Sequence, residues 1–216
     1  MKDIIIYGAR GFGKEVASLI RQINHAAGSP VWRLVGFIDD NDELWGQNVS
    51  HFATCIGGMA ALNAYPSEVG VAIAIGSPVI VNKIVNEISN SRVYFPNIIH
   101  PDFLITDPES FKIGKGNIIQ TGCIAMTDVT LGDFNLLNGD VALRHDDVVG
   151  SFNAFMPSVR LSGEVKVGDM NFFGVGSIVT QQVTIGNRVR LGAGSVLMSD
   201  TEDDSLYVGC PAGRKR

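Results

Sequence analysis

The histidines are the first candidates for chemistry, because imidazole gains and loses a proton near neutral pH. The chain has four of them. Three lie in polar, loop-like segments or next to a proline: His25, His51 and His100. The fourth, His145, is followed directly by Asp146 and Asp147. From the residues alone, His145 is equally well explained as a base and as a solvated histidine.

The glycine-rich segment Gly8–Lys14 is the second candidate. It fits the GxxxxGK part of a P-loop, but Glu15 stands where a P-loop has the Ser or Thr that holds magnesium. It also approximates a dinucleotide fingerprint, with its glycines in the order GxxGxG. Between a strand and a helix, such a turn presents backbone N–H groups and the helix dipole to a phosphate. The alternative is a tight turn without a ligand.

Two carboxylates, Asp39 and Asp40, follow the glycine turn at the end of a predicted strand. In this position they can accept hydrogen bonds from ribose or sugar hydroxyls. The alternative is a solvated strand end. The region is small for a complete dinucleotide site.

The first hundred residues show the βαβ pattern that positions such a turn. Short buried strands are predicted at Asp3–Tyr7, Leu34–Ile38 and Val69–Ile75. Helices are predicted at Lys14–Asn24 and from beyond Pro78 through Ile88. We therefore expect a small Rossmann-like α/β domain of about four strands over residues 1–100.

The second half carries an internal repeat. Every sixth residue from Ile113 to Leu197 is apolar, which neither a helical nor a simple strand period explains. A period of 18 lies on top, in the Ile/Leu/Val-Gly pairs that begin at Ile113-Gly114. Three hexapeptides thus make one triangular coil, and about five coils are expected. Residues 101–216 are predicted to form an all-β domain, a left-handed parallel β-helix.

Two polar features interrupt the apolar repeat. Asparagines recur every 18 residues at Asn117, Asn135, Asn153 and Asn171. We interpret them as structural, because Asn tolerates left-handed backbone and can bond to its copies in adjacent coils. Asp147 stands in an inward column otherwise occupied by valines, where a carboxylate is costly without a partner. Either the coil is locally distorted there, which we favour slightly, or Asp147 orients His145.

Charge, hydropathy and cysteine spacing argue against several classes of partner and site. A net charge of −5 argues against nucleic acid and anionic membranes, and no apolar run approaches the length of a membrane span. The three cysteines show no CxxC spacing, so neither a disulfide framework nor a metal site is predicted. No signal-peptide pattern is recognised. A cytoplasmic location is expected.

Several segments carry a resemblance to a known family. They are IIIYGARGFGKEV at the start, GFIDDN, AIG at 74–76, HP at 100–101, the repeat itself, and VGCPAG near the end. Over nearly its whole length the chain resembles the sialic-acid O-acetyltransferases and nucleotide-sugar N-acetyltransferases of the hexapeptide-repeat class. The resemblance implies a homotrimer with acetyl-CoA, as co-substrate, lying along the β-helix between two subunits. It also implies a nucleotide-sugar held by the N-terminal domain and acetyl transfer to a sugar amine or hydroxyl.

The resemblance also implies roles for single residues. His145 falls on the general base and Asp146 on the acidic residue that raises its basicity. The substrate-binding positions are Arg10, Gly11, Phe12, Asp39, Asp40 and Gly76. The coenzyme positions are Ala154, Gly163, Val175 and Ala193. We also expect the large apolar side chains of Phe155 and Phe173 to be covered by other parts of the assembly or of the chain.

The chain departs from the family at two positions. Well-studied members carry a histidine where Phe12 stands, so a polar contact to the substrate is missing here. Another histidine, from the family's coenzyme site, corresponds to Ala154. Acetyl transfer is the leading hypothesis. The alternative is a catalytically degenerate β-helix trimer that binds a nucleotide-sugar or CoA. A nicotinamide-dependent or nucleotide-hydrolysing enzyme is disfavoured, because the fingerprint is incomplete and no second catalytic domain is apparent.

Overall fold

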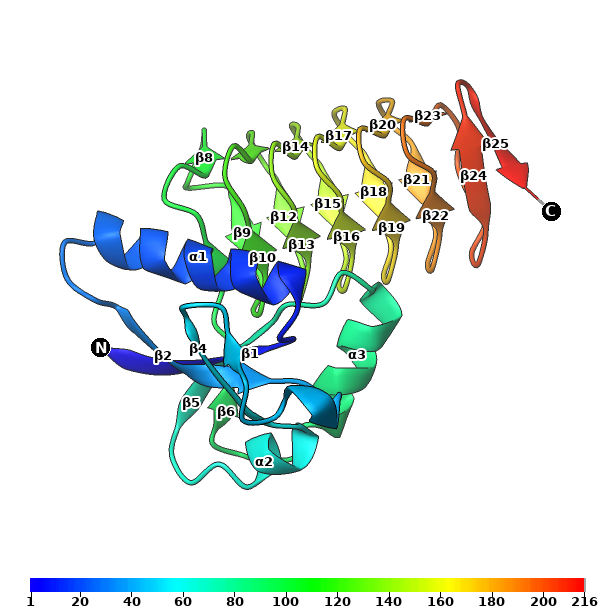
Figure 1. The fold of residues 1–216 in the computed structure, drawn as a ribbon. Helices are drawn as coiled ribbons and strands as arrows, with labels where there is room; N and C mark the ends of the chain where they lie inside the picture. Colours follow the sequence, from blue (N-terminus) through cyan, green and yellow to red (C-terminus); the bar gives the residue numbers. More distant parts are fainter. Residues whose placement is uncertain (216) are drawn as a thin grey trace. The chain divides into compact units, whose positions relative to one another are not determined.

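The computed structural model describes residues 1–215. They divide into two compact units, which Figure 1 shows in the colours of the sequence. The first unit comprises residues 1–76 and 80–101. The second comprises residues 77–79 and the chain from residue 102 onward.

The first unit is an α/β domain built on a six-stranded sheet in the order β3-β4-β2-β1-β5-β6. Its strands are β1 (Lys2–Tyr7), β2 (Trp32–Ile38), β3 (Asn48–Val49), β4 (Ala53–Gly57), β5 (Val69–Ile73) and β6 (Val93–Tyr94). All neighbours are parallel except β3 and β4. Further elements are the helices α1 (Gly11–Ala26), α2 (Met59–Asn63) and α3 (Pro78–Glu87), the 3-10 helix η1 (Asp42–Leu44) and the short strand β7 (Ile98–Ile99).

The central strand and the first helix explain the core of this unit. Ile4, Ile5 and Ile6 on β1 are fully buried, as expected of a parallel strand covered on both faces. Helix α1 buries Val16 and Leu19 on its apolar side. The sheet has six strands where about four were expected. The prediction missed β3 and β6 because they have two residues each and are too short for a periodic signal.

The second unit is the predicted left-handed parallel β-helix, whose stacked coils are visible in Figure 1. One face holds β8 (Leu104–Ile105), β11 (Ile124–Ala125), β14 (Ala142–Leu143), β17 (Arg160–Leu161), β20 (Ile178–Val179) and β23 (Val196–Leu197). A second holds β9 (Lys112–Ile113), β12 (Thr130–Leu131), β15 (Val148–Val149), β18 (Lys166–Val167) and β21 (Thr184–Ile185). A third holds β10 (Ile118–Ile119), β13 (Leu136–Leu137), β16 (Ala154–Phe155), β19 (Phe172–Phe173), β22 (Arg190–Leu191) and β24 (Leu206–Gly209), which pairs antiparallel with β25 (Ala212–Lys215).

The six-residue repeat fills the interior of the coils. Its apolar side chains are all buried from Ile119 to Leu197, and Ile113 is half-buried. Phe155 and Phe173 stack inside, with ring centroids 4.5 Å apart and at most 1% exposed. The cover expected for these two rings is therefore supplied by the interior of the β-helix itself.

The asparagine column is a hydrogen-bonded ladder. Asn117, Asn135, Asn153 and Asn171 are at most 1% exposed. The Oδ1 of each accepts the backbone N–H found 18 residues later, at 2.7 to 2.9 Å. The left-handed backbone belongs to the residues just before them, for example Phe134 and Phe152. The predicted stacking is thus confirmed, whereas the predicted left-handed conformation of the asparagines was wrong.

The described residues also bear on membrane spans, thiols and metal sites. No helix in the described part of the chain is long and apolar enough to cross a membrane. Cys55, Cys123 and Cys210 are free thiols. Within residues 1–215, no group of three or more His, Cys, Asp or Glu side chains is placed to hold a metal ion.

Removing one rung of the asparagine ladder tests its contribution to stability. Asn153→Val leaves the buried N–H of Asn171 without its acceptor, which should cost about 1 to 3 kcal/mol. The measurement is the midpoint of urea unfolding, with Asn138→Ala, outside the column, as control. Equal midpoints for the two variants would show that the ladder contributes little.

Candidate active site

His145 lies at the corner between β14 and β15. Its ring is exposed (60%), and its Nδ1 lies 2.9 Å from Oδ2 of Asp146. In the neutral tautomer that donates Nδ1–H to this carboxylate, Nε2 keeps its lone pair. The structure therefore pairs the two residues expected to act together and leaves one ring nitrogen able to accept a proton.

Gly163 lies beneath the His145 ring, in the next coil. A Cβ atom added to Gly163 would lie 2.3 Å from both Cε1 and Nε2 of the imidazole. The ring thus rests on bare backbone, which only a glycine offers at this position. The 18-residue spacing between His145 and Gly163 was visible in the sequence, but the ring contact was not.

Asp147 follows at the same corner with its carboxylate inside the β-helix. It is fully buried, and its oxygens accept hydrogen bonds from the backbone N–H groups of Arg144 (2.7 Å) and Val165 (2.9 Å). Burial raises the pKa of this carboxyl from 3.8 to about 7, against the opposing effect of the two N–H groups. Of the neighbouring charges, that of His145 lowers this pKa and that of Asp146 raises it.

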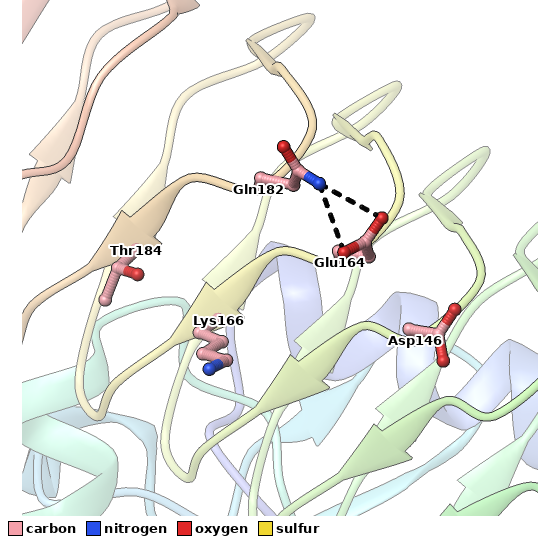
Figure 2. Close-up of a pocket in the computed structure, with 5 residues that line it drawn as sticks. All are labelled: Asp146, Glu164, Lys166, Gln182 and Thr184. Atoms are coloured by element: carbon pink, nitrogen blue, oxygen red, sulfur yellow. Dashed lines mark hydrogen bonds between the residues drawn. The ribbon is translucent and has the colours of Figure 1, made fainter.

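A polar cavity of about 500 Å³ borders Asp146 (Figure 2). It is lined by Asp146, Glu164, Lys166, Gln182 and Thr184. Gln182 donates from Nε2 to both carboxylate oxygens of Glu164, at 3.2 and 3.3 Å. Sequence reasoning missed Glu164 and Gln182, although they follow Asp146 at the 18-residue spacing. The cavity offers charged and hydrogen-bonding groups to a polar molecule next to the His145–Asp146 pair.

A second cavity, of about 420 Å³, is mainly apolar. Its lining includes two of the predicted coenzyme positions, Val175 and Ala193, together with Phe172 and Arg190. The Arg190 guanidinium lies 4.9 Å from the centroid of the Phe172 ring. The other two positions lie elsewhere: Ala154 is buried on β16, and Gly163 lies under His145.

The predicted substrate-binding positions all lie in the first unit, near the carboxyl ends of adjacent strands. Arg10, Gly11 and Phe12 follow β1 at the start of α1, Asp39 and Asp40 follow β2, and Gly76 follows β5.

Helix α1 begins without a side-chain cap and without an acidic residue in its first turn. Its N-terminal N–H groups are therefore suited to an anion.

The two carboxylates at this edge already have partners in the chain. Asp39 accepts from the backbone N–H groups of Ala9 (2.9 Å) and Asn41 (3.0 Å). Asp40 accepts from the Tyr7 hydroxyl at 2.8 Å, and burial together with this bond raises the pKa of Tyr7. These bonds fix the glycine turn against β2. The binding roles predicted for Asp39 and Asp40 stay predictions.

Comparison with known proteins adds to this geometry. Residues 3–88 match the family described as the PglD N-terminal domain. The chain is 28% identical to the acetyltransferase domain of PglB from Neisseria gonorrhoeae FA1090, with a TM-score of 0.88 over 100% of both chains. It is 26% identical to a perosamine N-acetyltransferase variant from Caulobacter crescentus in complex with CoA and GDP-perosamine, with a TM-score of 0.87 over 100% of this chain and 98% of that one. A search of curated proteins gave no match.

The α/β unit and the β-helix match solved acetyltransferases over the full length of the chain, and the protein is an acyltransferase. More particularly, the predicted resemblance to the nucleotide-sugar N-acetyltransferases is confirmed, over the full length by the solved structures and over residues 3–88 by the family model.

Filling the space above Gly163 should displace the His145 ring. Gly163→Ala places a Cβ within 2.3 Å of the imidazole, and the exposed ring can move aside without loss of core packing. We expect an unchanged melting temperature and a shifted Cε1-proton NMR resonance of His145. Gly213→Ala, where an added Cβ meets no atom within 4 Å, is the control. An unmoved resonance in Gly163→Ala would contradict the described contact.

Asp147 should make the protein less stable as the pH rises from about 4 to about 7. In this interval the unfolded chain has released the proton of this carboxyl whereas the folded chain retains it, so rising pH favours unfolding. We expect the free energy of unfolding of Asp147→Asn, relative to the unchanged protein, to rise across the interval. Urea unfolding at a fixed protein concentration measures it. Parallel curves would mean that Asp147 ionises normally.

Proposed function

We propose that this protein transfers the acetyl group of acetyl-CoA to the amine of a nucleotide-linked sugar, with His145 as the general base. The observation that carries the proposal is the pairing of His145 Nδ1 with Asp146 at 2.9 Å, which directs the basic Nε2 away from its partner. The similar PglB domain has been solved with acetyl coenzyme A, and the similar perosamine enzyme with CoA and GDP-perosamine.

The reaction needs a base because an amine loses a proton as it attacks a thioester carbonyl. Nε2 of His145 takes that proton while the new C–N bond forms. Asp146 stabilises the imidazolium that results, because its carboxylate already accepts from Nδ1. The C–S bond then breaks, and the imidazolium returns the proton to the departing thiolate. The products are the N-acetylated sugar and free CoA thiol.

We propose the mainly apolar cavity at Val175 and Ala193 as part of the acetyl-CoA site. Its apolar lining suits the pantetheine arm. The Arg190 guanidinium in the same lining supplies positive charge suited to a phosphate. Ala154 and Gly163 remain proposed coenzyme positions on the strength of the family resemblance.

We propose that the first unit holds the nucleotide-sugar through Arg10, Gly11, Phe12, Asp39, Asp40 and Gly76. The uncapped start of α1 supports a phosphate there. Space beside Gly76, where an added Cβ would meet no atom within 4 Å, supports close approach of a ligand to the backbone. The presence of Phe12 means that an apolar ring, not a histidine, faces this part of the acceptor.

We further propose a homotrimer with its active sites between subunits. Val148 on β15 is 47% exposed and Ile178 on β20 is 38% exposed, although both belong to the regular faces of the β-helix. Such apolar side chains are typical of surfaces that another chain covers.

The alternative, a degenerate trimer that binds without catalysis, rests on Phe12 and Ala154, which replace two family histidines. Thermal unfolding with acetyl-CoA and an assay of thiol release separate the two functions. A binding protein and an enzyme are both stabilised by the coenzyme, by about 2.7 kcal/mol at a 100-fold excess over Kd. Only the enzyme also releases thiol when an amino-sugar nucleotide is added.

Removing the base tests the proposed mechanism. His145→Ala should lower kcat by about 10²- to 10⁴-fold and leave the affinity for acetyl-CoA unchanged, because the imidazole acts on the acceptor. Asp146→Asn should cost less and shift the acidic limb of the pH–rate profile downward. Release of CoA thiol with UDP-, GDP- and CMP-linked amino sugars is the measurement, with His25→Ala as control. A His145→Ala enzyme with normal kcat would rule out this base.

A further inference from the structure

Asp147 occupies a position that valine fills in three other coils. At intervals of 18 residues, this position holds Val129, Asp147, Val165 and Val183. Each of the three valines is at most 4% exposed. Asp147 is equally buried. Because an isolated carboxylate is costly in such a place, its two hydrogen bonds point to a specific role at this coil.

The backbone hydrogen bonds between adjacent coils are interrupted at the coil that contains Asp147. In the coils around it, the residue three before the valine position donates its N–H to the next coil: Met126 to Leu143 O, Ser162 to Val179 O and Thr180 to Leu197 O. The Arg144 N–H instead donates to Asp147 Oδ2 at 2.7 Å. Accordingly, β14 pairs with β17 through one residue pair, whereas β11 pairs with β14 through two. The local distortion favoured from the sequence is present, and the carboxylate takes part in it.

The contact requires a side chain with two oxygens that can accept hydrogen bonds. Both partners of Asp147, the N–H groups of Arg144 and Val165, are donors. An asparagine can accept only through Oδ1 and would turn its NH₂ group toward the second donor. In the asparagine column the arrangement differs, since Asn135 donates from Nδ2 to the Gly150 carbonyl.

The altered rung lies directly beside His145. On the C-terminal side the ladder is regular, because Asp146 N–H donates to Thr127 O and the His145 carbonyl accepts from Glu164 N–H. On the N-terminal side, the Asp147 carboxylate replaces the missing rung at Arg144. The backbone at His145 is therefore held on its C-terminal side by backbone hydrogen bonds to adjacent coils. On its N-terminal side it is held by the side chain of Asp147.

We propose that Asp147 is a positioning residue for His145: by holding the Arg144 amide out of the β-helix ladder, it sets the corner from which the imidazole lies over Gly163. The catalytic consequence rests on the proposed function of His145. The geometric part does not, because the orientation of the ring can be measured without the reaction.

The test replaces Asp147 with valine, the residue at the same position in three other coils. Asp147→Val should let the Arg144 N–H return to the ladder, and it removes the side-chain acceptor of the Val165 N–H. The histidine ring should then move, and kcat should fall about ten- to a hundredfold while the KM for acetyl-CoA stays unchanged. Asp147→Asn keeps one of the two accepting oxygens. Its kcat should therefore lie between those of Asp147→Val and of the unchanged protein. Val129→Ala, in the same buried column, controls for lost packing and should reduce stability alone.

Two readouts separate position from catalysis. The first is the Cε1–H resonance and pH titration of His145, in protein labelled with ¹³C-histidine; the chain has four histidines, and His145→Ala assigns the resonance. The second is the rate of thiol release. A larger shift of the resonance in Asp147→Val than in Asp147→Asn, which removes the same charge, supports the positioning role, even if His145→Ala proves active and the proposed base is wrong. An unchanged resonance, titration and kcat in Asp147→Val would overturn it.

Discussion

The β-helix depends on one constraint: strands of two residues must be held by backbone hydrogen bonds to the coils on either side, 18 residues away. Such short strands have no stability of their own, so the coil registers cannot vary independently. Each corner residue therefore meets the residue 18 positions later, and the chemistry of a corner is decided by its neighbours in adjacent coils. His145 lies on Gly163 for this reason.

The same constraint governs the polar groups inside the coils. Asn135 and Asn153 fit because each accepts an N–H from the next coil and replaces water that burial removes. Asp147 joins the same pattern through Val165 but adds a second donor, Arg144. A single change of side-chain type thus converts a purely structural position into one that shapes the exposed corner beside it.

The first unit uses hydrogen bonds differently. At the carboxyl edge of its parallel sheet, Asp39 and Asp40 join the glycine turn and Tyr7 to the end of β2. A rigid turn with an uncapped helix start offers an anion preorganised N–H groups. The likeness to PglB and to the perosamine enzyme extends over the whole chain, and so includes both the α/β unit and the β-helix.

The sequence by itself determined the β-helix. Its six-residue period places one apolar side chain on each face of every coil, and burial of these side chains requires that they point inward. It also determined the α/β class of the first unit, whereas the expectation that His145 and Asp146 act together came from the family resemblance. The short strands β3 and β6 lay below what periodicity can detect. Only the tertiary structure decided which donors meet Asp147, what lies beneath the His145 ring and which acceptors of Asp39 are occupied. Hydrogen bonds between distant segments depend on distances of a few tenths of an ångström, and no local pattern of residues encodes them.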